Sequence, residues 1–154
     1  ALFLTFFIMA PTFTNIYELV AIPYMNGEIQ TPDALDKASM EIKSFMVTNT
    51  RETDLSMFAE ISGAQQFYSK EEIPFSIALP AFITSELKTA FQIGFLLFLP
   101  FLVIDMVVAS VLMSLGMMML SPMLIALPFK ILLFVLVDGW SMTVGSLVST
   151  YIVQ

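Results

Sequence analysis

The longest apolar stretch of the chain covers residues 94–140, and its only charged residues are Asp105, Lys130 and Asp138. A run of about 18 or more apolar residues is typical of a helix that crosses a membrane. The pattern therefore predicts that the second half of the protein lies in or beside a lipid bilayer.

Helix breakers divide this apolar half. A helix over residues 81–116 starts after Pro80, and at about 1.5 Å per residue it is longer than a hydrocarbon core of about 30 Å. Pro100 lacks a backbone N–H and is expected to kink this helix. Residues 116–122 form the predicted turn, because the residue before Pro122 is driven away from helical geometry.

Two further helices are predicted after this turn. An apolar helix covers residues 124–136 with Pro128 inside it, the Asp138-Gly139 dipeptide breaks the chain, and a final short helix covers residues 141–153. Broken helices at membrane depth are tolerated only where protein or a water-filled cavity covers the freed backbone groups. We therefore expect these helices to be buried inside an assembly.

The first half of the chain is more polar. Residues 1–13 are predicted to be the end of a hydrophobic helix, and their apolar part, residues 1–9, is too short to span a bilayer. We expect a chain that is truncated at its N-terminus. Residues 15–30 are predicted to be a connection, with Pro23 and Gly27 as breakers.

Two amphipathic helices follow. Residues 32–47 carry apolar side chains at helical spacing, and Thr31 is expected to cap this helix at its start. A second short helix covers residues 52–61 and ends at Ser62-Gly63. Residues 65–74 are predicted to be a loop.

Composition supports a membrane protein. The chain is 58% hydrophobic and 12% charged, whereas soluble domains carry about 25% charged residues. The net charge is -7, and acidic residues concentrate between Glu18 and Lys88. This balance argues against a nucleic-acid partner, because phosphate binding needs clustered Lys and Arg. There is no Cys or His for thiolate chemistry or the common zinc sites, and no catalytic motif, so we expect no enzyme, metal site or cofactor.

Charged residues inside apolar segments are the first candidates for function. Asp105 is expected to be either an ion or proton site, or a structural partner of another helix, with Lys130 as the partner; the second interpretation is favoured. Glu86 and Lys88 lie near the entry of the long helix. They are either a solvated helix start or part of a polar ring that several copies form around a channel.

Methionines are unevenly distributed. Half of the 12 lie between Met106 and Met123, and Met117, Met118 and Met119 are adjacent in the predicted turn. Methionine often fills irregular gaps in cores, which suffices for isolated positions. Three adjacent long, flexible, apolar side chains in a turn instead suggest a deformable plug that closes a pore.

Three segments identify a family. Residues 84–95, 100–120 and 127–140 closely resemble the FliP family of bacterial flagellar export-gate proteins, which has SctR relatives in virulence type III secretion systems. The first residues and the segment 34–58 also resemble this family, so the similarity covers essentially the whole chain as a single FliP-like domain. The amino-acid sequence of these segments resembles the flagellar branch more than the virulence branch.

The resemblance implies a fold and a role. It implies an all-α, membrane-associated protein that assembles in about five copies with FliQ and FliR, and with FlhB nearby, into a helical, cone-shaped gate. Unfolded flagellar substrates pass through this gate across the bacterial inner membrane, and much of the complex lies on the periplasmic side. The resemblance implies no catalytic role and no cofactor.

The resemblance also assigns roles to three sets of residues. A methionine gasket that closes the channel corresponds to Met117, Met118 and Met119. Positions that narrow the channel above the gasket correspond to Phe45, Phe58 and Glu86. Charged positions that are expected to form structural pairs correspond to Arg51, Lys88, Asp105 and Lys130.

Two other functions stay open at this stage. An ion-coupled secondary transporter would use Asp105 to bind its ion, but the internal repeats common in such folds are absent from the sequence. A purely structural membrane scaffold would explain the apolar composition, but it gives no reason for adjacent methionines in a turn.

Overall fold

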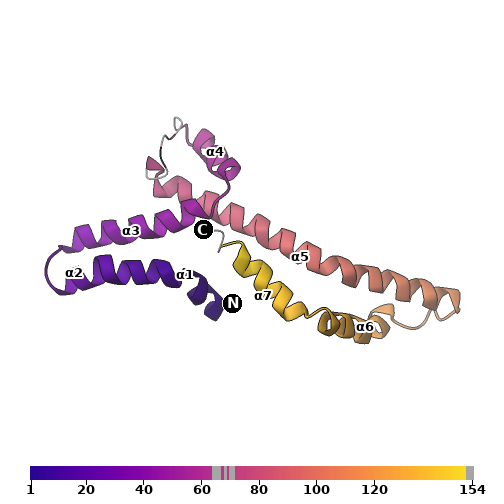
Figure 1. Ribbon diagram of the computed structural model, residues 1–154. Coiled ribbons are helices and arrows are strands. Elements are labelled where there is room, and N and C mark those ends of the chain that lie inside the picture. The colour runs from indigo at the N-terminus through magenta and orange to yellow at the C-terminus, as the bar shows by residue number, and fades with distance from the viewer. Residues whose placement is uncertain (64–66, 68, 70–71, 152–154) are drawn as a thin grey trace. The chain divides into compact units, whose positions relative to one another are not determined.

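The computed structural model describes residues 1–63, 67, 69 and 72–151 of the chain, and the regular elements among them are all helical (Figure 1). The predicted all-α class is therefore confirmed. The chain divides into two compact units, Ala1–Lys88 and Thr89–Gln154, which are described separately below. The long helix α5 contributes residues to both.

The first unit begins with one long helical segment rather than a short helix and a connection. It consists of α1 (Leu2–Ile16), a π-helical turn (Tyr17–Ala21) and α2 (Ile22–Met25). The prediction that residues 15–30 form a connection is therefore wrong for residues 15–25, which are helical. At 24 residues the segment is long and apolar enough to cross a membrane, which corrects the expectation that this part is too short.

The π-helical turn explains why Pro23 does not break the helix. The Ile22 N–H donates to the carbonyl of Tyr17, five residues earlier, so this turn is wider than an α-helical one. A wider turn relieves the clash that a proline ring makes with the carbonyl four residues before it. The segment ends at Gly27, where φ is +75° and two hydrogen bonds close a Schellman motif.

Helix α3 (Thr31–Thr48) then runs back along α1 and the π-helical turn (Figure 1). The predicted amphipathic helix is confirmed with small changes of its ends, and Pro32 occupies its first turn as expected. The expectation that Thr31 caps this helix is wrong, because Gln30 is the N-cap residue and Thr31 is already helical. The Thr31 hydroxyl instead lies 3.3 Å from the hydroxyl of Tyr24.

Helix α4 (Glu52–Ile61) has the bounds that the sequence predicted, and Gly63 follows it with φ of +69°. A small hydrophobic core forms beneath it from Val47, Ile73, Ile77 and Ala78, with Leu55, Phe58 and Phe67 packed against these side chains. The predicted loop over residues 65–74 lies largely outside the described residues.

Helix α5 (Phe75–Ser114) has 40 residues and starts earlier than predicted, so the interpretation of Pro80 as a helix start is wrong. The carbonyl of Pro74 accepts hydrogen bonds from the backbone N–H groups of Ile77 and Ala78, so the helix begins before Pro80. Ile77 and Ala78 are buried, and packing of this first turn offsets the hydrogen bond that Pro80 removes. The helix continues through Pro100 and is long and apolar enough to cross a membrane.

The second unit contains the rest of α5 together with α6 (Pro122–Leu136) and α7 (Gly139–Ser149). The predicted break between the last two helices is confirmed, because Asp138 adopts the left-handed conformation (φ 51°, ψ 53°) and the helices meet at 61°. Gly139 is required there, since a Cβ at this position would overlap the Phe134 ring. Helix α7 starts two residues before the predicted helix, whose last residues lie outside the described range.

Candidate functional site

The short segment between α3 and α4, residues 49–51, is called the corner here. It is joined to α5 by two hydrogen bonds to one residue. The Arg51 N–H donates to the Ser85 hydroxyl at 3.2 Å, and the Arg51 Nη1 donates to the Ser85 carbonyl at 3.1 Å. We call this pair of contacts the Arg51–Ser85 clasp. Arg51 is the N-cap residue of α4, so the clasp fixes the start of that helix on α5.

Small side chains let the corner approach α5 closely. Ala78, Ala81 and Ser85 are all buried, and Ser85 is only 1% exposed. Residues three and four positions apart share one face of a helix, so these three residues form a stripe of small side chains on α5. Within the corner, Asn49 Nδ2 donates to the Phe45 carbonyl at 2.8 Å and the Thr50 hydroxyl donates to the Met46 carbonyl at 2.6 Å. These contacts satisfy the last carbonyls of α3.

Asp54 is an additional buried carboxylate in the first turn of α4. It is 8% exposed, and its Oδ2 atom has no hydrogen-bond partner among the described residues. The first turn of a helix stabilises negative charge, because backbone N–H groups there point outward along the helix dipole. This field contributes to the tolerance of a buried acid at this position.

All three residues predicted to narrow a channel lie in the first unit, and all are half-buried. Phe45 makes an edge-to-face contact with Phe82 of α5, with ring centroids 6.1 Å apart. Phe58 packs against the core cluster under α4. Glu86 directly follows Ser85 in α5. The structure thus brings the three elements that carry these residues together around the clasp.

The four charged residues predicted to pair behave differently. Lys130 Nζ of α6 lies 2.6 Å from Asp105 Oδ2 of α5, so the pair suggested by the sequence is present. Their side chains are 21% and 28% exposed, and Asp105 Oδ1 is buried without a partner in the described part of the chain. Arg51 binds Ser85, as above. Lys88 is exposed, and among the described residues the structure gives it no ion pair.

The faces of α5 and α6 near the ion pair form an open apolar cavity of about 470 Å³. Its walls include Ile104 and Phe129, the sequence neighbours of the two charged residues, together with Val107 and Leu112. Almost no polar surface lines it, so this cavity suits an apolar side chain or helix rather than a polar ligand.

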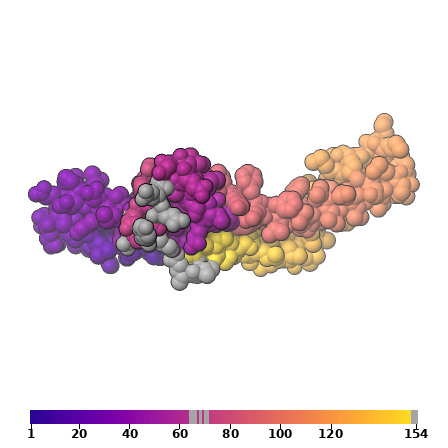
Figure 2. All heavy atoms as spheres, turned by 90° about the horizontal axis from the view of Figure 1, so that it is seen from above, coloured from indigo at the N-terminus to yellow at the C-terminus, as the bar shows by residue number. Residues whose placement is uncertain are grey.

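The predicted turn after α5 is present, and residues 116–121 are called the methionine loop here. Gly116 has φ of +72°, its N–H donates to the Met113 carbonyl, and the Met117 N–H donates to the Leu112 carbonyl at 3.0 Å. These two bonds form a Schellman motif, which ends a helix sharply and favours glycine at the left-handed position. The orange segment that includes this loop stands at one end of the second unit (Figure 2).

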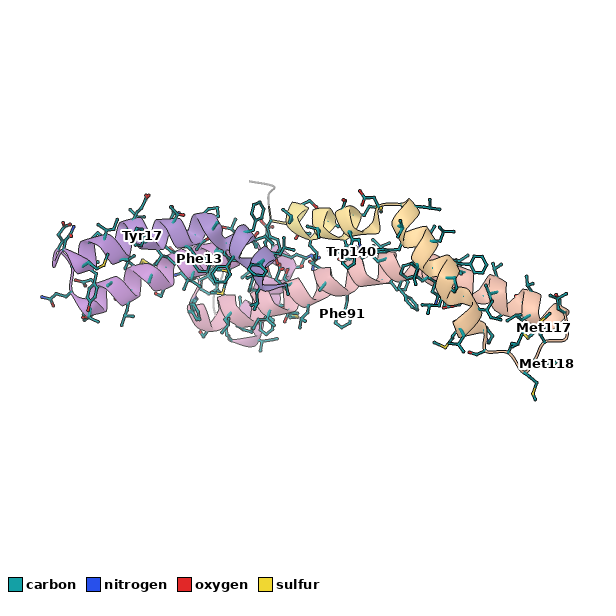
Figure 3. All side chains as sticks on the ribbon, turned by 90° about the horizontal axis from the view of Figure 1, so that it is seen from below. Phe13, Tyr17, Phe91, Met117, Met118 and Trp140 are labelled. Carbon is teal, nitrogen blue, oxygen red and sulfur yellow. The ribbon has the colours of Figure 1, made fainter. Side chains whose placement is uncertain are left out.

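The three methionines of the loop are solvent-exposed. Met117 is 43% exposed, Met118 is 81% exposed and Met119 is 100% exposed. Figure 3 shows Met117 and Met118 at the tip beyond α5, with Met118 pointing away from the helices. Side chains this exposed have no fixed packing within the chain, so they are free to adopt other rotamers against a partner.

Among the described residues, no group of three or more His, Cys, Asp or Glu could hold a metal ion.

Comparison with known protein sequences identifies the family of this chain. The sequence model of the FliP family matches residues 1–147. The chain belongs to the FliP family. It is a membrane protein of this family, and its described residues include two helices that could cross a membrane, or three if the bent α6–α7 pair is one span.

Curated relatives are named as flagellar biosynthetic proteins. The flagellar biosynthetic protein FliP of Cereibacter sphaeroides is 61% identical over 98% of this chain and 50% of its own length. The FliP of Bacillus subtilis (strain 168) is 56% identical over 98% of this chain and 68% of its own length. The FliP of Caulobacter vibrioides is 51% identical over 98% of this chain and 57% of its own length. The chain thus spans half to two thirds of these FliP relatives.

Sequence reasoning missed two buried residues of this FliP-family chain, one in the clasp and one in the first turn of α4. Ser85 was not singled out, because a serine inside an apolar helix carries no distinctive pattern. The spacing of Ala78, Ala81 and Ser85 is the signal that could have found it, since small residues on one face indicate close approach of another element. Asp54 was hidden among the other acids of the first half.

Proposed function

We propose that this chain is part of a core subunit of the flagellar type III protein export gate. With further copies of itself and with FliQ, FliR and FlhB, it forms the channel through which unfolded flagellar substrates cross the inner membrane. It acts as a passive gate without catalytic chemistry. Membership of the FliP family and relatives named as flagellar biosynthetic proteins support the flagellar role over the virulence one.

The exposed methionine loop is the observation that carries this proposal. It places three flexible apolar side chains at a sharp turn, after a helix long enough to cross a membrane. A ring of such side chains from several copies excludes water, and apolar constrictions close pores by dewetting. An arriving unfolded chain replaces these contacts with its own side chains, so the seal persists during transport.

Pairing of the first two helical segments supports a position outside the hydrocarbon layer of the membrane. Helix α3 packs along α1 and the π-helical turn, and it carries the charged residues Asp33, Asp36, Lys37, Glu41 and Lys43. Placing both helices in hydrocarbon would bury these charges in lipid, which is costly. The arrangement favours a hairpin that is covered by other protein chains outside the hydrocarbon layer.

The contact between Asp105 and Lys130 supports a structural role for both residues. Lys130 donates a hydrogen bond to Asp105 Oδ2 at 2.6 Å, so a coupled cation at the remaining oxygen, Oδ1, would have to bind beside the Lys130 ammonium group. This pairing weighs against the transporter function and favours α5 and α6 acting as a fixed pair in the gate.

A leak assay tests the gate. Cells that produce the full-length protein with its partners would carry alanine at Met117, Met118 and Met119. The matched control carries alanine at three exposed methionines in helices, Met106, Met113 and Met142. We expect ions and small molecules to leak through the loop variant while export persists, and the control to stay closed. If the loop variant leaks no more than the control, the gasket is refuted.

A further inference from the structure

The Arg51–Ser85 clasp provides the hydrogen-bond acceptor for the N-cap N–H of α4 from a different helix. Arg51 is the N-cap residue of α4, and the N–H of an N-cap residue is often satisfied by a side chain three residues later in the same helix. Here the acceptor is the hydroxyl of Ser85, 34 positions away on α5. The start of α4 is therefore held by a different helix.

Two contacts to one serine restrict the corner more than one contact would. The Arg51 main chain binds the Ser85 hydroxyl, and the far end of the Arg51 side chain binds the Ser85 carbonyl. Since these donors are separated by the length of the arginine side chain, together they limit both translation and rotation of the corner on α5. Burial of Ser85 and Ala81 excludes water that would compete for the same groups.

The restricted corner lies between the residues that were predicted to narrow the channel. Phe45 occupies the last turn of α3, where its carbonyl accepts hydrogen bonds from the Asn49 backbone and side chain. Phe58 lies on α4, beyond the clasp. The neighbour of Ser85 in α5 is Glu86. Movement of the corner would shift both aromatic side chains relative to Glu86.

We propose that Ser85 is a positioning residue that holds the corner, and with it Phe45 and Phe58, in a fixed place on α5. The inference rests on the proposed function, because it concerns residues that line the proposed channel. It makes the constriction a rigid element, formed before any substrate arrives, in contrast to the deformable methionine loop.

Hydrogen exchange of the full-length protein in its assembled complex tests this. Ser85→Ala removes the acceptor of the Arg51 N–H without adding volume. We expect amides of residues 49–58 to exchange about tenfold faster, since a donor left unsatisfied favours local opening by about that factor. Amides of residues 123–136 should be unchanged. Ser56→Ala is the matched control, because Ser56 is exposed and its hydroxyl bonds the Glu52 carbonyl in its own helix.

Arg51→Lys is the second variant, in case Ser85→Ala does not assemble. It keeps the main-chain contact with the Ser85 hydroxyl and loses the Nη1 contact, so we expect a smaller acceleration at the same amides. If exchange at residues 49–58 stays at the wild-type rate in both variants, or rises equally throughout the chain, the inference is overturned.

An ion-leak measurement on the same variants separates this inference from the proposed function. Faster exchange at the corner together with a raised leak supports both. Faster exchange with an unchanged leak supports Ser85 as a positioning residue and refutes the role of Phe45 and Phe58 in narrowing the channel. Unchanged exchange overturns the inference alone, because the methionine variants test the gate independently.

Discussion

The corner and the methionine loop are two connections between helices with opposite physical character. In the corner, side chains and main chain are hydrogen-bonded to one another and to Ser85, beside a small buried core. In the methionine loop, the turn itself is fixed by Gly116, but the side chains of Met118 and Met119 are almost fully exposed. One connection fixes side chains, and the other fixes only the backbone that presents them.

In the proposed gate, this difference would let one chain form a constriction of fixed width together with a seal that accommodates polypeptides of varied sequence. A rigid constriction needs side chains whose rotamers are determined by packing. A seal that adapts to varied polypeptides needs unbranched, flexible apolar side chains on a stable turn. If the two regions differ as described, substitutions in them should produce effects of different kind and size.

The largest effect is expected from overfilling the close contact beneath the corner. Ala81 is fully buried on the same face of α5 as Ser85, one turn earlier, and Ala81→Leu adds volume to this buried stripe. We expect destabilisation of about 3 kcal/mol, the upper part of the range for overpacked cores, and a strong loss of assembled complex. Ala90→Leu, at an exposed position of the same helix, is the control. Equal yields of the two purified complexes would mean that the corner is not tightly packed.

A smaller effect is expected from breaking the ion pair of the second unit. Asp105→Ala leaves Lys130 without its partner, and we expect a loss of about 2 kcal/mol, less than for a fully buried pair because both groups are partly exposed. The loss should appear as reduced yield and thermal stability of the complex. Adding Lys130→Met should recover part of it, and the double-mutant cycle measures the coupling.

A different result for the Asp105–Lys130 pair would contradict its structural role. Normal assembly of the Asp105→Ala protein with loss of proton-dependent export would assign Asp105 a conducting role. In that case the transporter-like interpretation that the sequence left open would replace the structural one.

The comparison also shows which parts of the fold local sequence signals determine. The bounds of α4 follow from an apolar stripe that ends at Ser62-Gly63, and the sequence predicted them correctly. The turn after α5 follows from Gly116 and Pro122, and it was also predicted, although Pro122 is already the first residue of α6. The two main errors concern Pro23 and Pro80, which were interpreted as a breaker and a helix start. A π-helical turn accommodates the first, and burial of the turn before it stabilises the second. Neither effect is visible in a local pattern.

The candidate site divides in the same way. Adjacent methionines in a predicted turn, and two opposite charges in apolar helices, are patterns that sequence reasoning can find. The hydrogen bonds between Arg51 and Ser85 join positions 34 apart, and no local pattern indicates which serine lies opposite the corner. The family resemblance therefore indicated Arg51 as a structural residue, but no sequence pattern indicated its partner.

A third prediction concerns the backbone of the methionine loop. Gly116 has positive φ, so Gly116→Ala strains the turn and should lower stability by about 1 kcal/mol. Gly94 lies inside α5 with open space around it, and Gly94→Ala should instead raise stability by a similar amount. Opposite shifts of the two thermal midpoints would support a rigid turn. Shifts of the same sign would show that the turn rearranges in the assembly.

The smallest effect is expected from changing the shape of one loop side chain while keeping it apolar. Met118 is highly exposed, so Met118→Leu should alter the stability of the complex by less than about 0.5 kcal/mol. Leucine is branched and adapts to fewer surfaces than methionine, so the leak should stay at the wild-type level in the resting state and rise only while a substrate occupies the channel. Electrical recordings with and without an arrested substrate would separate the two states. A large loss of stability would show instead that Met118 is firmly packed against other chains in the assembly, and the loop would then belong with the corner as a rigid element.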